Sequence, residues 1–111
     1  MTPAKKFMGE FEQMVVAAVL RLGDGAYGAS IIEALAESTG REVSSGALSI
    51  TLDRMERKGL VRSELRDATE ERGGRRRRYI RLTPTGLALA RESRAALLSA
   101  WQEIEEAYGE V

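Results

Sequence analysis

The spacing of apolar residues changes after Gly59 from the period of a helix to that of strands, and it changes back at Thr83. Two short segments lie between these residues, LVRSEL at 60–65 and RRYIRL at 77–82, and a polar, glycine-bearing stretch separates them. This pattern predicts a β-hairpin whose loop is too long to be a tight turn. A chain with helical segments on both sides of one hairpin is expected to be mainly helical, with a small antiparallel sheet of two or three strands.

Three helices are predicted before the hairpin. Apolar residues recur at steps of three and four over residues 7–22, and a second, shorter helix is predicted over residues 28–38. The third helix is expected to begin at Ser44 or Ser45, because a serine hydroxyl there accepts a hydrogen bond from an otherwise unpaired backbone N–H. Its expected end is Gly59.

A last helix is predicted after the hairpin, with Thr83 as its N-cap, and it is expected to run to about Tyr108. This order of elements is that of a winged helix-turn-helix, in which the third helix enters the major groove and the hairpin forms a wing beside it. At 111 residues the chain is most economically a single compact unit. Residues 1–83 are expected to form the DNA-binding domain, and residues 84–111 a C-terminal dimerisation helix.

The chain contains no cysteine and no histidine. Disulfides, thiolate chemistry and Ser-His or Cys-His nucleophilic pairs are therefore excluded, and a metal site would depend on carboxylates alone. No phosphate-binding loop motif is present, so we expect neither enzyme activity nor a cofactor. No apolar run reaches the length of a membrane span, and the first residues lack the apolar core of a signal peptide, which predicts a cytoplasmic protein without a membrane partner.

The net charge of zero conceals an uneven distribution of charge along the chain. Residues 41–81 carry twelve bases against seven acids, a net charge of +5. Residues 1–40 carry a net charge of −2, and residues 82–111 a net charge of −3. The middle of the chain therefore suits an anionic polymer, and the two ends do not.

Four consecutive arginines, preceded by two glycines, lead into the second predicted strand. Because alternate residues of a strand point to opposite faces, Ile80 and Leu82 are expected to face the core, and Tyr79 and Arg81 the other side. A charge run is often only solvated surface, but its place in a hairpin and the lack of acids beside it favour contacts with phosphates or the minor groove. The residues expected to make these contacts are Arg75, Arg76, Arg77 and Arg78.

The predicted third helix separates a core face from a face for reading DNA. Leu48, Leu52 and Met55 share one side at helical spacing and are expected to be buried. Ile50, on the other side, is either a stray apolar residue or a contact for a thymine methyl group, and its polar neighbours can bond base edges. The residues expected to read bases are Ser45, Ser49, Ile50 and Arg54, and the further phosphate candidates are Tyr27 and Lys58.

Apolar residues of the last predicted helix recur at alternating steps of three and four, the spacing of a coiled-coil seam. Because a three-helix core cannot cover the whole of this helix, a second copy of the chain is expected to pack on it. Trp101 is interpreted as the anchor of this dimer or, alternatively, as part of a cleft for a small planar aromatic effector. The residues expected at the dimer interface are Phe11, Val15, Leu97, Trp101, Ile104 and Tyr108.

Three segments together resemble the PadR family of bacterial transcriptional regulators: AYGASIIEAL at 26–35, SSGALSITLDRMERKGLV at 44–61 and GGRRRRYIRLTPTG at 73–86. The resemblance implies a homodimeric winged-helix repressor whose third helix and wing bind an inverted-repeat operator in double-stranded DNA. Because one helix follows the wing, it implies the small subclass with a single C-terminal helix. The chain has Leu48-Ser49-Ile50 where the family usually has Leu-Tyr-Pro, so the tyrosine contact expected there is absent.

Two other functions fit the same predicted fold. A winged-helix protein–protein adaptor would present Ile50 and the wing to a protein partner rather than to DNA. A ligand sensor would use Trp101 to capture planar aromatic compounds. Binding of random duplex DNA at low salt separates the regulator from the adaptor, and quenching of tryptophan fluorescence tests the sensor.

Overall fold

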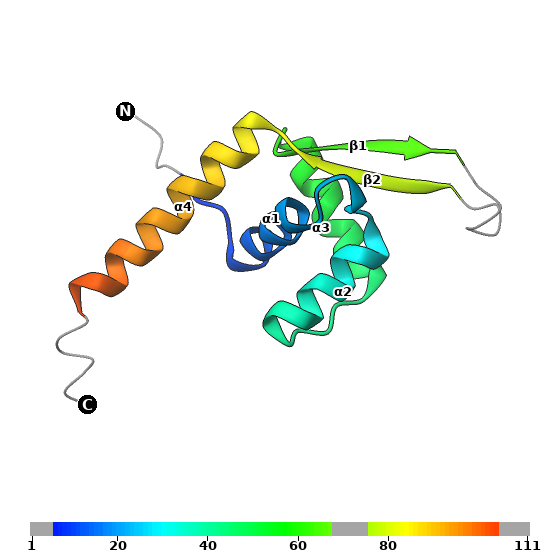
Figure 1. The fold of residues 1–111 in the computed structure, drawn as a ribbon. Helices are drawn as coiled ribbons and strands as arrows, with labels where there is room; N and C mark the ends of the chain where they lie inside the picture. Colours follow the sequence, from blue (N-terminus) through cyan, green and yellow to red (C-terminus); the bar gives the residue numbers. More distant parts are fainter. Residues whose placement is uncertain (1–5, 68–75, 105–111) are drawn as a thin grey trace.

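The structure is a computed structural model that describes residues 6–67 and 76–104. The elements in these residues are α1 (Glu10–Leu22), the short 3₁₀ helix η1 (Gly23–Gly25), α2 (Gly28–Thr39), α3 (Ser45–Arg57), β1 (Val61–Arg66), β2 (Arg77–Leu82) and α4 (Pro84–Glu103). Helices α1, α2 and α3 pack together, the hairpin projects from one side of them, and α4 leads away on the other side (Figure 1). The prediction of a mainly helical chain with a small antiparallel hairpin and a C-terminal helix is confirmed.

A serine cap begins α3, and a left-handed glycine follows its end. Ser44, not Ser45, is the N-cap, and its hydroxyl accepts a hydrogen bond from the N–H of Ala47 at 3.1 Å. The helix ends at Arg57, and Gly59 then adopts a φ of 75°, a conformation that glycine takes at low steric cost. The chain turns there from α3 directly into β1.

Thr83 caps α4 and also ties this helix to the turn after α3. Its hydroxyl accepts the N–H of Gly86 at 3.0 Å and donates to the carbonyl oxygen of Gly59 at 2.6 Å. The base of α4 is therefore fixed against the start of the hairpin. The helix ends at Glu103, and the predicted extension to Tyr108 lies outside the described residues.

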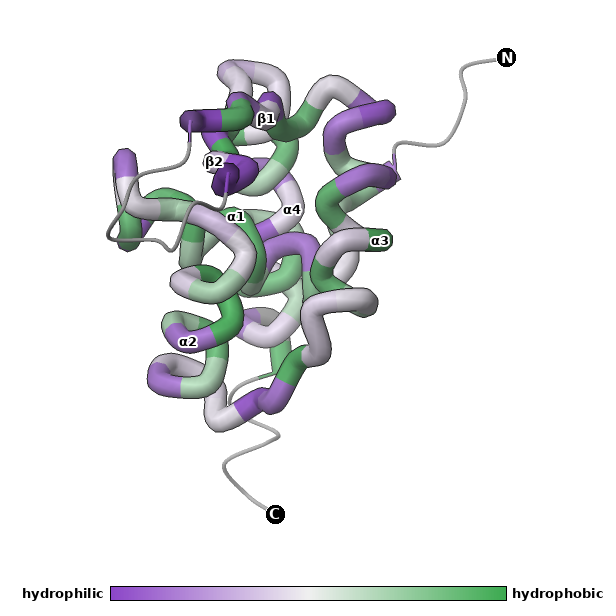
Figure 2. The backbone as a smooth tube through the Cα atoms, turned by 90° about the vertical axis from the view of Figure 1, so that its right-hand side faces the viewer, coloured by the Kyte–Doolittle hydropathy of each residue, from purple (hydrophilic) through white to green (hydrophobic). Residues whose placement is uncertain are grey.

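The core lies between α1, α2, α3 and the inner face of the hairpin. Its largest fully buried side chains come from all of these elements: Val15, Ile31, Leu35, Leu48, Met55, Val61 and Ile80. Hydrophilic stretches lie in the hairpin strands and on turns of α2 and α3 (Figure 2). Helix α1 begins at Glu10, three residues later than predicted, and the backbone N–H of Met8 before it donates to the hydroxyl of Ser93 on α4 at 2.7 Å. Within the described ranges, no helix combines the length and apolarity needed to cross a membrane.

The two strands pair antiparallel, with Val61 opposite Leu82. The connection between η1 and α2 lies along β2, because the N–H of Ile80 donates to the carbonyl oxygen of Ala26 at 2.8 Å. Tyr79 was expected on the face of β2 away from the core, yet it is only 8% exposed. Tyr79 is shielded there by two side chains, because the Tyr27 ring lies 5.5 Å from its ring and the Arg66 guanidinium lies 3.7 Å from its ring centre.

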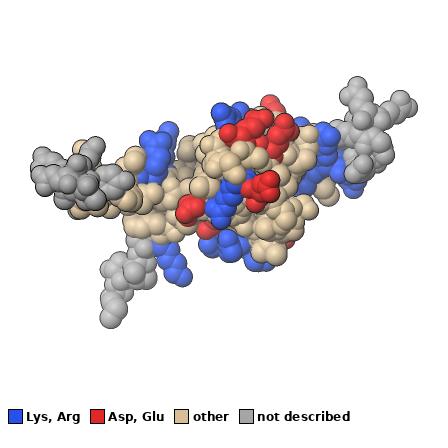
Figure 3. All heavy atoms as spheres, turned by 90° about the horizontal axis from the view of Figure 1, so that it is seen from below, with Lys and Arg blue, Asp and Glu red and all other residues tan. Residues whose placement is uncertain are grey.

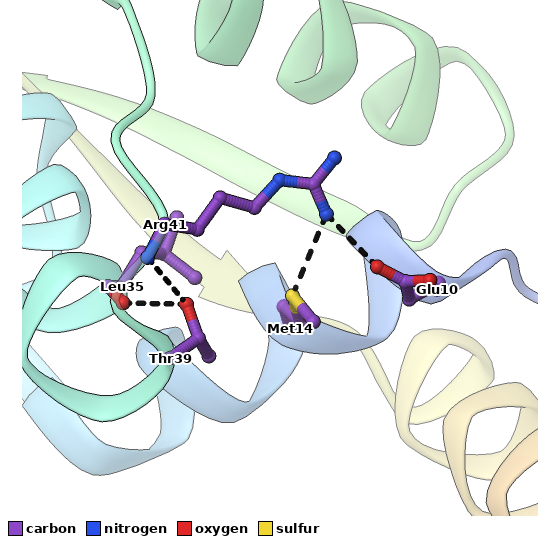
Figure 4. A network of polar contacts seen from close by, with 5 residues as sticks. All are labelled: Glu10, Met14, Leu35, Thr39 and Arg41. Atoms are coloured by element: carbon purple, nitrogen blue, oxygen red, sulfur yellow. Dashed lines mark hydrogen bonds and ion pairs between the residues drawn. The ribbon is translucent and has the colours of Figure 1, made fainter.

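The loop that leads into α3 is held against α1 by Arg41 (Figure 4). Its guanidinium Nη1 lies 2.9 Å from Oε1 of Glu10 and 3.8 Å from Sδ of Met14, and the guanidinium carbon lies 5.0 Å from the centre of the Phe11 ring. The backbone N–H of Arg41 donates to the hydroxyl of Thr39 at 3.2 Å. These contacts fix the approach to α3 from both preceding helices.

Candidate nucleic-acid interface

The outer face of α3 carries the side chains that the sequence predicts as base readers. These exposed residues are Ser45, Ser49, Ile50 and Arg54. Ile50 is 66% exposed, and nothing lies within 4 Å of the Cβ position at Gly46 one turn before it, so the surface beside Ile50 is open. The opposite side of α3 is buried, as predicted for Leu48, Leu52 and Met55. An exposed apolar side chain on an otherwise polar face suits contact with a partner.

A groove of about 290 Å³ separates this side of α3 from the first residues of β2. Ser45 and Ser49 line it from α3, Tyr27 from the start of α2, and Arg77 and Arg78 from β2. Its other lining residues are mostly apolar: Gly28, Ala29, Ile32, Leu48 and Leu52. Two of the predicted base readers, Ser45 and Ser49, and two of the predicted wing contacts, Arg77 and Arg78, therefore line one shared depression.

Two arginines and two tyrosines form a stack at the end of the hairpin where β1 ends and β2 begins. The guanidinium of Arg77 lies 4.1 Å from the centre of the Tyr27 ring, and that of Arg66 lies 3.7 Å from the centre of the Tyr79 ring. The two rings lie 5.5 Å apart at 58°. Stacking occupies the flat faces of a guanidinium and leaves the N–H groups in its plane for anionic partners. Tyr27 therefore orients Arg77.

Like charges face one another twice across the hairpin. Arg66 lies opposite Arg77, and Arg62 lies opposite Arg81. Such cross-strand pairs are unfavourable in isolation. Asp24 relieves the second pair through an ion pair with Arg81 at 2.9 Å. Basic side chains lie at the hairpin end of the molecule, whereas acids and bases are mixed over the helices (Figure 3). A hairpin that concentrates positive charge in this way favours an anionic partner.

Arg76 immediately precedes β2 and is more exposed than Arg77 and Arg78. Its side chain is 59% exposed, and its ion pair with Asp67 is long, at 3.6 Å, with Asp67 almost fully exposed. An exposed pair of this kind is weak and is screened by salt. Arg75 lies outside the described residues.

Arg78 is held by α3 instead of pointing outward. Its Nη1 lies 3.0 Å from Oδ1 of Asp53, and its Nη2 lies 3.0 Å from Oε2 of Glu56. Its side chain is 28% exposed. The sequence predicts Arg78 as a phosphate contact, but in this structure both ends of its fork already bind carboxylates of the chain.

Glu56 also binds the first strand. Its carboxylate accepts the N–H of Ser63 at 3.0 Å and a short hydrogen bond from the Ser63 hydroxyl. The hydroxyl of Ser63 is the main cause that lowers the pKa of Glu56, and the Ser63 N–H and the charge of Arg78 add to it against a smaller opposing effect of burial. This carboxylate therefore stays ionised at neutral pH and joins α3 to both strands.

Lys58 lies at the C-terminal end of α3, and it compensates a carboxylate of α1. Its Nζ lies 3.7 Å from Oε2 of Glu12, whose side chain is only 10% exposed. This oxygen has no hydrogen-bond partner among the described residues, so the ion pair with Lys58 offsets part of the cost of its burial.

The second half of α4 is exposed on all sides. Every side chain from Arg94 to Gln102 is exposed, and the large apolar ones lie on one stripe. These residues are about half exposed: Leu97, Leu98, Trp101 and Ile104. A second groove, of about 300 Å³, runs between α1 and α4 and ends at Leu20, which is 55% exposed. The exposed apolar residues of a typical monomer are scattered singly, whereas these lie together, so this surface suits an interface.

The two predicted dimer residues on α1, Phe11 and Val15, are not part of this exposed surface. Val15 is completely buried in the core of its own chain, so it cannot contact a partner, and its assignment to the interface is wrong. Phe11 is partly buried beneath the guanidinium of Arg41. Tyr108 lies outside the described residues. Leu20 was not predicted, although it is a large, exposed apolar residue of α1.

The acids around Arg78 are the other residues that the sequence did not assign. Neither Asp53 nor Glu56 is among the site residues predicted from the sequence. The spacing of Asp53 and Glu56, one turn apart, is a signal that two carboxylates share one side of the helix. Their partner on β2 could be found only from the packing of the hairpin.

Three packed helices, an open face on the third and a basic hairpin beside it define the class of winged helix-turn-helix proteins. The sequence model of the transcriptional regulator PadR-like family matches residues 16–92, and the chain belongs to this family. The family is one of regulators rather than enzymes. No curated protein matches the chain.

Solved structures share this fold over most of their length. A PadR-like transcription factor from Bacteroides fragilis is 28% identical, with a TM-score of 0.64 over 90% of this chain and 87% of that chain. A transcriptional regulator from Clostridium thermocellum is 21% identical, with a TM-score of 0.70 over 86% and 89%. A PadR family transcription regulator from hypervirulent Clostridium difficile is 24% identical, with a TM-score of 0.63 over 90% and 96%. The last two show similarity of fold alone.

Proposed function

We propose that the chain is a homodimeric, sequence-specific DNA-binding repressor that reads an inverted-repeat operator. The observation that carries this proposal is the groove that places the open face of α3 beside the guanidinium groups of β2. An α-helix fits the major groove of DNA, and a basic hairpin next to it then meets the phosphate backbone. In this arrangement residues 1–83 bind DNA, and residues 84–111 form the dimer.

Helix α3 makes the contacts to bases. The hydroxyl groups of Ser45 and Ser49 and the guanidinium of Arg54 supply hydrogen bonds to base edges. Ile50, which is 66% exposed, packs against the methyl group of a thymine. Because Gly46 has no side chain, the backbone of α3 can approach the bases closely at that turn.

The hairpin makes the contacts to the backbone. Arg76 is exposed and only weakly paired, so it can exchange Asp67 for a phosphate. Arg77 is oriented by the ring of Tyr27 beside the groove, and Arg75 precedes both in the sequence. Phosphate contacts of this kind release condensed counterions and give affinity without sequence preference.

The apolar stripe of α4 forms the dimer. Trp101 and Leu97 are half-exposed on a helix segment whose side chains from Arg94 to Gln102 are all exposed, and a second copy is the simplest partner for such a stripe. Two-fold symmetry then presents two reading helices, which predicts half-sites about one helical turn apart, or roughly 34 Å.

Fluorescence anisotropy with a labelled duplex of random sequence tests this function. The regulator binds the duplex at low salt, and its affinity falls steeply as salt is raised. Arg21→Met serves as a charge-matched control for hairpin variants, because Arg21 is an exposed residue in the last turn of α1, outside α3, the hairpin and α4. Absence of duplex binding at low salt would instead support a protein–protein adaptor.

A further inference from the structure

Arg78 differs from the other hairpin arginines in its surroundings. Its side chain is 28% exposed, compared with 59% for Arg76 and 63% for Arg81. The other two each have one ion pair to an acid that is itself almost fully solvated, whereas Arg78 has two, both at 3.0 Å. A guanidinium held at both ends of its planar fork has a fixed orientation.

The two acids that hold Arg78 also determine where the hairpin lies. Asp53 and Glu56 are three residues apart and therefore lie on the same side of α3. Glu56 binds Ser63 of β1 as well, so one carboxylate joins α3 to both strands. An isolated two-stranded hairpin is only marginally stable, and contacts of this kind fix its angle to the helix.

The local charge of this cluster is opposite in sign to that of a phosphate site. Two carboxylates surround one guanidinium, so Asp53, Glu56 and Arg78 together carry a net charge of −1. A phosphate that approaches Arg78 meets this negative charge, whereas one that approaches Arg76 meets a weakly paired cation. Negative charge beside a DNA-binding face weakens backbone contacts made without regard to sequence.

We propose that Asp53 and Glu56 are positioning residues for DNA recognition: they hold Arg78 away from the phosphates and fix the hairpin against α3. This inference rests on the proposed function and refines it, since it removes Arg78 from the phosphate contacts and gives it a specificity-determining role. The hairpin reaches the duplex through Arg76 and Arg77, and the cluster sets the angle at which it does so.

Salt titrations of a small set of variants separate this role from a direct contact. Each phosphate contact contributes about 0.9 to the slope of log affinity against log salt, so a contact that both subunits of a dimer make contributes about 1.8. A slope of about 1.8 corresponds to a change in affinity of about 12-fold between 50 and 200 mM salt. We expect Arg76→Met to lower the slope by this amount. We expect Arg78→Met to keep the slope of the wild type and to lose preference for a duplex selected from a random pool over a random duplex. Arg21→Met controls for the loss of charge, and circular dichroism controls for folding.

Two further variants sharpen the test. Arg78→Lys keeps the charge but cannot bind two carboxylates in one plane, so it should lose sequence preference as Arg78→Met does. The isosteric double variant Asp53→Asn with Glu56→Gln should bind the random duplex more tightly than the wild type, with a steeper salt slope. If the double variant does not fold, Asp53→Asn alone is measured in its place.

The inference is overturned if Arg78→Met lowers the salt slope as much as Arg76→Met, or if Arg78→Lys restores sequence preference. It is also overturned if neutralising the acids leaves affinity for the random duplex unchanged. A wild-type protein that binds no duplex at all overturns the proposed function and this inference with it. Binding by the wild type, together with a salt slope that Arg78→Met lowers as much as Arg76→Met does, overturns the inference alone.

Discussion

Gly86→Ala tests the contact that fixes α4 against the start of the hairpin. An ideal Cβ at Gly86 would lie 2.0 Å from the carbonyl oxygen of Leu60 and 2.8 Å from Cδ1 of Leu82. The Leu60 oxygen is a backbone atom that also accepts the N–H of Thr83 at 3.1 Å, so it cannot rotate away as a side chain can. The methyl group of alanine therefore forces α4 and the turn after α3 apart.

The expected cost of Gly86→Ala follows from two opposing effects. Overpacking by a methyl group costs about 1–3 kcal/mol, and a backbone obstacle places this site at the upper end. Alanine in a helix recovers about 0.5–1 kcal/mol relative to glycine. The net loss in unfolding free energy is about 2 kcal/mol, which lowers Tm by about 8–16 °C in a domain of this size.

Gly46→Ala is the matched control, because nothing lies within 4 Å of its Cβ position in α3. The same substitution there is expected to stabilise the protein by about 0.5–1 kcal/mol. Thermal unfolding followed by circular dichroism at one protein concentration measures both variants. If Gly86→Ala is as stable as the wild type, then α4 does not approach Leu60 as described, and the placement of the C-terminal helix is refuted.

Three other predictions concern binding, assembly and pH. Replacing the contacted thymine by uracil should weaken DNA binding by the wild type about fourfold, because one buried methyl group is lost. The same replacement should not change DNA binding by Ile50→Ala. Equal losses of affinity in both proteins would rule out the contact. Trp101→Ala should weaken the dimer by about 2 kcal/mol or roughly 30-fold, and an unchanged mass in solution across dilution would remove Trp101 from the interface. Because the pKa of Glu56 is lowered from 4.5, its contribution to stability is present above that pH and is lost as the pH falls below it. Glu56→Gln should therefore flatten the acid side of the stability profile, and superimposable acid limbs would contradict this.

Local signals in the sequence account for most of the elements. The change of period after Gly59, the left-handed glycine itself and the threonine cap at Thr83 place α3, the hairpin and α4 within a few residues. These features act through bonds between near neighbours in the chain. The positions at which these helices and strands begin and end therefore depend little on how distant segments pack.

The contacts of the site residues depend on segments that are distant in the sequence, so these contacts were harder to predict. The alternation of strand residues gave the two faces of β2, but it did not reveal that the side chains of Tyr27 and Arg66 shield Tyr79 from solvent. The arginine run gave the charge of the hairpin, but the partners of Arg78 come from α3, more than twenty residues earlier. An apolar stripe on α1 did not indicate whether the same chain or a second copy covers it, and Val15 is covered by its own chain.

Selection of bound duplexes from a random pool by the wild-type protein tests the central claim most directly. If the open face of α3 and the basic hairpin form a duplex-reading surface that paired subunits present twice, the enriched sequences are palindromic, with half-sites about one helical turn apart. No enrichment, or enrichment of a sequence without two-fold symmetry, would contradict it.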